Sequence, residues 1–352
     1  MSRTPLDTVA AMLSRGLRIL VGLAAALIVL AGVQALSDIV GPAFLALTLV
    51  IAVGPLMTRL SRRGAPTWVV VAVPLAVVLL VLAALGLAVV VSVARFTALI
   101  PQYAAQFQHL LTEVQAYLAT FGITQAQATK LFSGIEPGEL VQAAAGLLSG
   151  LLGTASATVV IVLLLYGMCM DAPFLTEQLR GLASSRRDIV EALTTFTRQT
   201  CKYLLVSTLF GLIVAVLDAG ALWILGVPLP LLWGLLAFIT NFIPNIGFII
   251  GLVPPALLAL LDSGVGTMLW VIVVYCVLNF IIQSVIQPKF VGESAGLSVT
   301  ITILSLLVWT WALGALGAIL AVPLSSFVRA ILLDSDPATR WATPLVAGKS
   351  SD

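Results

Sequence analysis

The chain has 352 residues, of which 61% are hydrophobic and only 9% are charged, against about 25% charged residues in a typical soluble protein. With 17 basic and 15 acidic residues, the net charge is only +2. So few charges cannot cover a soluble globule of this size, which excludes an ordinary soluble enzyme, a disordered chain and a nucleic-acid-binding protein. The apolar residues form continuous runs instead of alternating with polar ones. This pattern predicts an all-α integral membrane protein and not a β-barrel.

The first charged residues mark out two membrane spans. Nineteen uncharged residues lie between Arg18 and Asp38, and 20 lie between Asp38 and Arg59. A helix needs about 20 apolar residues to cross a hydrocarbon core of ~30 Å, so each run is the length of one crossing. A tight turn at Ser37-Asp38 is expected between them. With the longer runs that follow, the sequence predicts about six full transmembrane helices.

The basic residues predict the orientation. If both termini and the stretch from Arg180 to Lys202 lie in the cytoplasm, 15 of the 17 basic residues are inside, and only Arg95 and Lys130 are outside. Such asymmetry is typical of the positive-inside rule. It predicts a multi-pass protein of a cytoplasmic membrane with both termini in the cytoplasm.

Two apolar runs do not fit this orientation as single spans. Segment 229–261 must begin and end outside, so a re-entrant helical hairpin is expected, with its tip near the helix breakers Pro244 and Gly247. Segment 297–330 must begin and end inside, and as one straight helix it would measure ~50 Å. A break between Gly314 and Gly317 would make it a second hairpin, opposed to the first; one long tilted helix is the alternative.

Amphipathic segments are expected on both sides of the membrane. On the outer side, apolar residues recur at alternating steps of three and four from Phe96 to Phe121, which is a heptad pattern. Such a helix packs on the membrane or on its own bundle, or else on a neighbouring subunit. The predicted regions are three N-terminal spans (1–94), an extracytoplasmic helical segment (95–146), a fourth span with a cytoplasmic amphipathic segment (147–202), a transport core (203–333) and a cytoplasmic tail (334–352).

Polar side chains inside apolar runs are the candidates for a functional site, because polarity at membrane depth is costly. Tyr275, Asn279, Gln283 and Gln287 recur at every fourth residue and form one stripe along a helix. They either bond to neighbouring helices or line a solute path. Asp218 is an acid inside an apolar run, and it is either solvated at the headgroup level or a coupling-ion residue.

The predicted tip of the first hairpin carries the other candidates. Thr240, Asn241, Pro244, Asn245 and Gly247 lie where the helix is expected to break. Broken helices expose backbone N–H and C=O groups, which is how membrane transporters bind solutes and ions near the midplane. These residues are therefore predicted to bind a small polar solute together with the polar stripe.

The sequence contains no catalytic constellation. Residues 292–296 match the GxSxG pattern of serine hydrolases, but the single histidine, His109, is predicted on the opposite side of the membrane. The Gly-Lys-Ser at 348–350 lacks the first glycine of a phosphate-binding loop, since position 343 is threonine. Neither enzymatic activity nor an ATPase subunit, a cofactor or a metal site is expected.

The second half of the chain contains recognisable motifs. These are Phe-Ile-Pro-Asn-Ile-Gly ending at Gly247, Gln-Pro-Lys followed by Val-Gly-Glu-Ser within 287–294, and Ala-Val-Pro ending at Pro323. In this order and spacing they resemble the bacterial autoinducer-2 exporter family over about the last 125 residues. The pattern of apolar runs resembles that family over the remainder of the chain.

The resemblance implies a secondary transporter of the bacterial cytoplasmic membrane. It would export a small polar, furanone-type quorum-sensing signal through an elevator-like motion of its hairpins, the second of which contains Gly314, Gly317 and Pro323. The resemblance also implies a homo-oligomer, namely a pentamer. Other members of the family are linked to sodium/proton exchange, for which Asp218 would be the coupling residue. A membrane scaffold without a solute path is the alternative from a different class.

Overall fold

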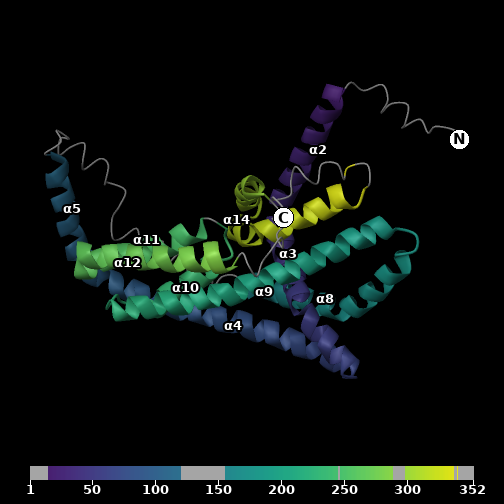
Figure 1. Ribbon diagram of the computed structural model, residues 1–352, viewed down its shortest axis with the longest axis horizontal. Helices are drawn as coiled ribbons and strands as arrows, with labels where there is room; N and C mark the ends of the chain where they lie inside the picture. The colour runs from purple at the N-terminus through teal and green to yellow at the C-terminus, as the bar shows by residue number, and fades with distance from the viewer. Residues whose placement is uncertain (1–14, 120–154, 245, 288–297, 337–338, 340–352) are drawn as a thin grey trace.

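The computed structural model of the chain describes residues 15–119, 155–244, 246–287, 298–336 and 339, and within these ranges it contains helices and no strands (Figure 1). The first part comprises α2 (Arg15–Ala35), α3 (Ser37–Arg62), α4 (Thr67–Leu99), the 3₁₀-helix η1 (Ile100–Tyr103) and α5 (Ala104–Ala119). The second part comprises α8 (Ala155–Leu182), α9 (Arg187–Ile224), α10 (Pro230–Thr240), α11 (Gly247–Ser263), α12 (Val265–Asn279), the π-helix η2 (Phe280–Ile286), α14 (Val299–Arg329) and the π-helix η3 (Ala330–Asp334).

The surface of the helices is apolar, as the sequence predicts for a protein in a bilayer. Large side chains such as Ile28, Leu80 and Trp223 are more than two-thirds exposed, an arrangement that is costly in water but favourable against lipid. Among the described residues, six helices are long and apolar enough to cross a membrane. The prediction of an all-α integral membrane protein is confirmed.

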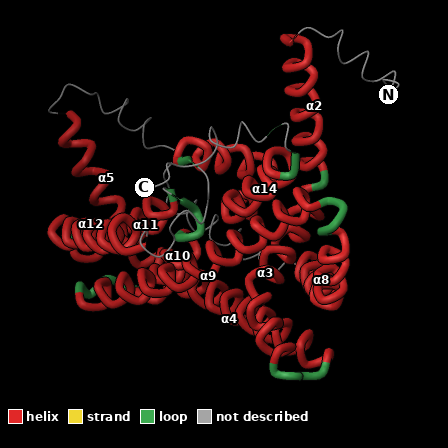
Figure 2. Tube along the Cα trace, turned by 45° about the vertical axis from the view of Figure 1, so that its right-hand side comes forward, coloured by secondary structure: helices red, strands yellow, loops and turns green. Residues whose placement is uncertain are grey.

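The six long helices are not the six predicted spans. The described apolar part of α2, Leu20–Ala35, is one of the shorter apolar helices, whereas Val299–Asp334 is one of the six long ones. Between α2 and α3 only Leu36 leaves the helical conformation. Because both views show α2 extending away from α3, this break bends the chain without folding it back (Figures 1 and 2).

Helix α9 connects the helices at the two ends of the described bundle. It has 38 residues and therefore measures ~57 Å at 1.5 Å per residue, well beyond the ~30 Å of a hydrocarbon core. Figure 1 shows α10, α11 and α12 along one end of α9 and α8 at its other end. The charged end of α9, from Arg187 to Lys202, belongs to the stretch that the sequence predicts to be cytoplasmic.

Apolar clusters among the described residues hold the bundle together. Phe44 of α3, Phe196 of α9 and Phe327 of α14 pack ring against ring, with centroids 5.6 and 5.3 Å from Phe327. A second cluster joins the end of α9 to α10, α11 and α12, and a third joins α3, α4 and α8. Because α9 contributes to the first two clusters, it links α3 and α14 to the region that contains the polar residues.

The first residues of the heptad segment pack against helices of the same chain. Phe96 packs edge-on against Trp233 of α10, with ring centroids 5.6 Å apart. The hydroxyl of Tyr103 donates a hydrogen bond to Asp262 Oδ1 near the end of α11 at 2.5 Å. Beyond Tyr103, α5 extends away from the other helices in both views (Figures 1 and 2). The first part of the predicted seam is therefore intramolecular, and Phe121 lies outside the described residues.

Helix α14 is sharply bent. Gly314 has φ 63° and ψ −142°, a conformation that glycine alone adopts without strain. A Cβ on Gly317 would lie 1.8 Å from the carbonyl oxygen of Trp309, so the two arms touch through their backbones. Trp309 Nε1 also donates a hydrogen bond to Ser325 Oγ at 2.8 Å. The predicted break at Gly314 is present, and the alternative of one straight tilted helix is wrong.

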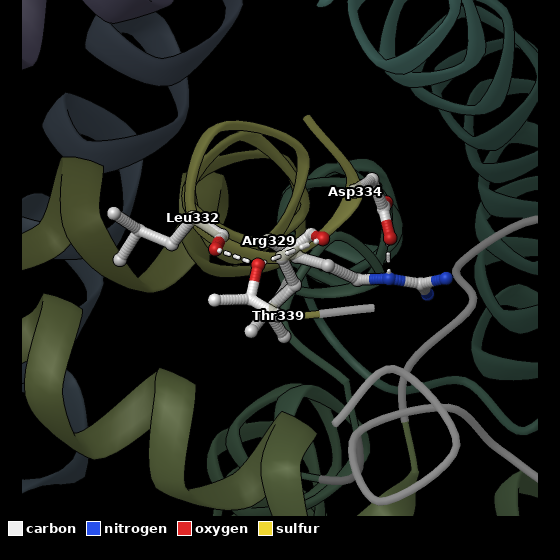
Figure 3. Close-up of polar contacts among 5 residues, drawn as sticks. Arg329, Leu332, Asp334 and Thr339 are labelled. Atoms are coloured by element: carbon white, nitrogen blue, oxygen red, sulfur yellow. Dashed lines mark hydrogen bonds and ion pairs between the residues drawn. The ribbon is translucent and has the colours of Figure 1, made fainter. Parts of the chain in front are cut away.

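Polar contacts follow the end of α14. Arg329 Nε lies 3.3 Å from Asp334 Oδ2 across the π-helix η3 (Figure 3). The hydroxyl of Thr339 lies 2.9 Å from the Leu332 carbonyl oxygen and donates to it. The ion pair and this hydrogen bond satisfy polar groups where the regular helix ends.

Candidate functional site

Helices α10 and α11 fold back on each other as a helical hairpin. The connection contains Pro244, which cannot donate a helical hydrogen bond, and α11 begins at Gly247. A Cβ on Gly247 would lie 1.8 Å from the carbonyl oxygen of Thr240, and one on Gly251 would lie 3.2 Å from Thr240 Oγ1. The two glycines, four residues apart on one face of α11, therefore allow its backbone to lie directly against α10.

The hairpin also packs closely against α9. A Cβ on Gly234 would lie 2.7 Å from the carbonyl oxygen of Ala215. At the tip, the hydroxyl of Tyr203 donates a hydrogen bond to the carbonyl oxygen of Phe242 at 3.3 Å. Ile243 packs against the apolar cluster that contains Trp309 of α14. The tip is thus fixed both to α9 and to the bent helix.

A chain of amide hydrogen bonds crosses from the hairpin to the polar stripe. Asn241 Nδ2 donates to the carbonyl oxygen of Ser207 on α9 at 2.9 Å. Gln283 Nε2 donates to Asn241 Oδ1 at 3.3 Å and to Asn279 Oδ1 at 2.9 Å. Asn279 Nδ2 in turn donates to the Tyr275 carbonyl oxygen at 2.9 Å. The side chains of both candidate groups therefore form one network.

A pocket lies beside this network, between the hairpin on one side and α9 and α12 on the other. It encloses about 220 Å³ of space between atoms, part of it open to solvent, and has room for about one water molecule. Its lining consists of Val214, Asp218, Ala237, Thr240, Asn241, Gly247, Phe248, Gly251, Tyr275, Asn279 and Gln283. A site for anything larger than water is closed in this conformation.

Two polar groups in the pocket lack hydrogen bonds. Asp218 and Tyr275 are each 1% exposed. Neither carboxylate oxygen of Asp218, nor the hydroxyl of Tyr275, has a hydrogen-bond partner among the described residues. The amide of Asn279 is the polar neighbour of the Asp218 carboxylate, but it makes no hydrogen bond of ordinary geometry with it. Asp218 therefore lies buried inside the protein and is not exposed to solvent at its surface.

The remaining predicted residues lie elsewhere or outside the described part. Gln287 continues the stripe beyond the pocket and is half-buried, and Pro244 lies at the half-buried tip. Asn245 is outside the described residues. Gly314, Gly317 and Pro323 belong to α14, which does not contribute to the pocket lining.

Sequence reasoning missed several residues that shape the site. Val214, Ala237 and Phe248 line the pocket but are ordinary apolar residues in the sequence. A Cβ on Gly211 would lie 2.9 Å from Asn241 Nδ2, so this glycine leaves space for the amide to reach α9. Gly251 differs from these residues, because its four-residue spacing from Gly247 in the sequence indicates close helix packing in membranes, and it lines the pocket.

These features define a class of protein. Its apolar helices span a membrane, its polar side chains gather at a broken helix pair, and the pocket among them is closed, which is the construction of a membrane transport protein.

The chain belongs to the AI-2E family of transporters, with residues 19–335 matching the family. It is 29% identical over 314 residues to YhhT of Escherichia coli (strain K12), covering 89% of this chain and 90% of that protein. It is 30% identical over 329 residues to a protein of Haemophilus influenzae, covering 92% and 94%. It is 26% identical over 317 residues to the AI-2 transport protein TqsA of Escherichia coli (strain K12), covering 90% and 92%.

Proposed function

We propose that this protein is a secondary transporter that exports a small polar solute of the autoinducer-2 type across the bacterial cytoplasmic membrane. The observation that carries the proposal is the pocket of amide, hydroxyl and carboxylate groups between the α10–α11 hairpin and helices α9 and α12. Polar groups at such depth are retained where they meet a solute or an ion. The name of the relative TqsA supports the class of solute.

The chemistry of the pocket matches a hydroxylated solute. Asn241, Asn279 and Gln283 present both donors and acceptors, and Thr240 and Tyr275 add hydroxyl groups. In the closed conformation these amides bond to one another. A solute with hydroxyl and carbonyl groups would replace these bonds with bonds of similar strength, so that binding and opening cost little polar hydrogen bonding.

The hairpin is the proposed moving part. The pocket has room for about one water molecule, so the solute enters only when α10 and α11 withdraw from α9 and α12. We propose that the hairpin is re-entrant and moves as a unit, as in an elevator, with Pro244, Asn245 and Gly247 at its tip and Gln287 at the mouth. The bend of α14 at Gly314, with Gly317 and Pro323, would form the opposed second gate; the contact of Ile243 with the α14 cluster supports this pairing.

Transport by the purified protein tests the proposal. Proteoliposomes loaded with autoinducer-2 are diluted into solute-free buffer, and the released solute is quantified by mass spectrometry. The wild-type chain is expected to release autoinducer-2 faster than empty liposomes, and Asn279→Ala is expected to slow release several-fold because it removes a pocket amide. Thr176→Ala, a change at an exposed hydroxyl of α8 bonded only to its own helix, is the matched control. Equal rates for wild type and empty liposomes would reject the proposal.

Cation/proton exchange is the second candidate function. The burial of Asp218 without a hydrogen-bond partner favours it, because carboxylates inside membrane proteins commonly carry ions or protons. A pH-sensitive dye inside proteoliposomes distinguishes it: a NaCl gradient alone would move protons in an exchanger, even without an organic solute.

The proposal extends to the orientation of the protein in the membrane and to its oligomeric state. We propose that both termini face the cytoplasm, because this places 15 of the 17 basic residues inside. We also propose a homo-oligomer, a pentamer, in which α5 packs on a neighbouring subunit. The extension of α5 away from its own bundle supports this assembly (Figure 2).

A further inference from the structure

A row of buried residues continues from the pocket along one face of α9. At steps of three or four residues, which keep positions on one side of a helix, its members are Thr200, Tyr203, Ser207, Gly211, Val214 and Asp218. The last two line the pocket. From there to Thr200 the row extends over ~27 Å at 1.5 Å per residue, close to the thickness of a hydrocarbon core. Its far end therefore lies in the charged part of α9, where Arg198 and Lys202 are exposed.

The hydroxyl of Thr200 has no partner in the fold. The side chain is 3% exposed, and Oγ1 makes no hydrogen bond with the described residues. Threonines inside helices can bond to the carbonyl oxygen one turn earlier, as Thr194, Thr197 and Thr208 do on the same helix. A buried hydroxyl that lacks such a bond destabilises the protein. Its presence at the end of the row calls for a partner that comes from outside the chain.

Tyr203 closes the row against the tip of the hairpin. Its hydroxyl donates a hydrogen bond to the carbonyl oxygen of Phe242 at 3.3 Å, which is long for a bond between two oxygen atoms. That carbonyl oxygen is available because the helix is broken here. The Ile246 N–H, which would reach it in a regular helix, bonds to the carbonyl oxygen of Pro244 at 2.8 Å instead. The contact between α9 and the tip is therefore a weak bond that the tip can release.

Ser207 joins the row to the pocket. Its side chain is 2% exposed, and its hydroxyl is a polar neighbour of the Tyr203 hydroxyl. Its carbonyl oxygen accepts the hydrogen bond from Asn241 Nδ2, and Asn241 lines the pocket. Hydroxyl groups, each of which can both donate and accept, thus follow one another from the charged end of α9 to the pocket.

We propose that Thr200, Tyr203 and Ser207 form the cytoplasmic entry path of the transported solute, and that Tyr203 is the gate residue of this path. The proposal deepens the proposed transport function and rests on it, and it places the charged end of α9 in the cytoplasm. Withdrawal of the hairpin tip breaks the bond between Tyr203 and Phe242 and uncovers the three hydroxyl groups. A hydroxylated solute then finds a hydrogen-bond partner at each step towards the pocket.

The chemistry of the row selects the kind of solute. Between Thr200 and Val214 the row contains no charged side chain, so nothing in it compensates an ion that leaves water. Hydroxyl groups, in contrast, replace the water molecules around an uncharged polar solute one by one. The path is therefore specific for uncharged, hydroxylated molecules.

Cysteine accessibility tests the path without reference to transport. Thr200→Cys and Ser207→Cys are made in a variant whose native cysteines are serine, and the reaction with a membrane-impermeant methanethiosulfonate reagent is timed. Both cysteines should react in inside-out membrane vesicles and not in right-side-out vesicles. Saturating autoinducer-2 should slow the reaction several-fold. Addition of Tyr203→Phe should accelerate it several-fold, because the bond that closes the tip is lost.

Thr48 of α3 provides the matched control. It is also a buried threonine, 1% exposed, but its hydroxyl bonds to the carbonyl oxygen of Phe44 at 3.0 Å. Thr48→Cys should stay unreactive in both kinds of vesicle, with or without Tyr203→Phe. Equal reactivity at positions 48 and 200 would show general loosening of the bundle and would overturn the path.

Transport kinetics separate a path from mere packing. Thr200→Val keeps the shape of the side chain and removes the hydroxyl, so it should raise the KM for autoinducer-2 release several-fold at similar kcat. Its Tm should equal or exceed that of wild type, because an unpaired buried hydroxyl has been removed. Thr48→Val should leave KM unchanged. An unchanged KM with a lowered Tm for Thr200→Val would assign Thr200 to packing and overturn the path.

The path and the proposed solute fail in different ways. Cysteines at positions 200 and 207 that are unreactive from the cytoplasmic side, even with Tyr203→Phe, would reject the path and leave the transporter. Reaction from the outer side alone, or reaction that autoinducer-2 does not slow although it is released, would also reject it. Cytoplasmic reactivity that Tyr203→Phe increases, without any release of autoinducer-2, would reject the solute and support the path.

Discussion

Gln283 Nε2 donates a hydrogen bond to Asn241 Oδ1 at 3.3 Å, across 42 residues of sequence. The bond joins the π-helix η2 to the tip of the α10–α11 hairpin. Insertion of a π-turn changes the direction of side chains on a helix and is frequent at functional sites. The position of the hairpin tip is thus held in part by a few hydrogen bonds between side-chain amides.

Removing this amide contact should loosen the hairpin without unfolding the bundle. Asn241→Ala and Gln283→Ala are each expected to cost about 1 kcal/mol of unfolding free energy, and the double variant less than the sum, because both remove the same bond. Thermal unfolding of the three variants gives the coupling energy. Strict additivity would show that the 3.3 Å contact contributes nothing to stability.

Gly247 should tolerate no side chain. A Cβ would lie 1.8 Å from the Thr240 carbonyl oxygen, so Gly247→Ala must push α11 away from α10, and overpacking of this kind costs about 1–3 kcal/mol. We expect Gly247→Val to abolish transport at near-normal expression. Gly86→Ala in α4, where a Cβ meets nothing within 4 Å, is the control and should retain activity. Full transport by Gly247→Val would mean that the tip need not close on α10.

The bend of α14 should depend on Gly317 more than on the Trp309–Ser325 bond. Ser325→Ala removes one hydrogen bond from the indole, worth about 1 kcal/mol. Gly317→Ala places a methyl group against the Trp309 carbonyl oxygen, 1.8 Å away, and should lower Tm by clearly more. The two variants and their combination are compared by thermal unfolding. A smaller effect of Gly317→Ala would contradict direct backbone contact between the arms.

An oligomer formed through α5 should be sensitive to charge at Phe107, which is half-buried. Phe107→Asp should dissociate the assembly, because a charge in a packed interface is left unpaired. Native mass spectrometry in detergent measures the change. His109→Ala, at an exposed position of the same helix, should leave the assembly unchanged. An unaltered mass for Phe107→Asp would place the subunit contact elsewhere.

The orientation of the protein in the membrane can be measured by labelling single-cysteine variants. In a background where Cys169, Cys201 and Cys276 are serine, His109→Cys should react with a membrane-impermeant maleimide in intact cells. Ser184→Cys, at the exposed turn between α8 and α9, should react only after the membrane is opened. The reverse pattern would invert the topology.

The fold class and the place of both chain reversals were available from the sequence because they depend on local chemistry. Continuous apolar runs can only be membrane helices, since every backbone group must be satisfied in lipid. Pro244 and Gly247 interrupt such a run, and Gly314 adopts a conformation closed to other residues. The polar stripe from Tyr275 to Gln287 follows from helical periodicity, and three of its four members line the pocket.

Only the tertiary structure decided which of these residues meet. The burial of Asp218 depends on how α9 packs against the hairpin and α12, and no pattern within α9 itself contains that information. The same holds for Gly211, which matters because the Asn241 side chain lies against it. It holds also for Phe96 and Tyr103. Their heptad spacing is compatible with either an intramolecular or an intersubunit seam, and the structure shows Trp233 and Asp262 of the same chain as their partners. Sequence periodicity fixes which face of a helix is polar or apolar, but the partner of that face is set by packing between segments far apart in the chain.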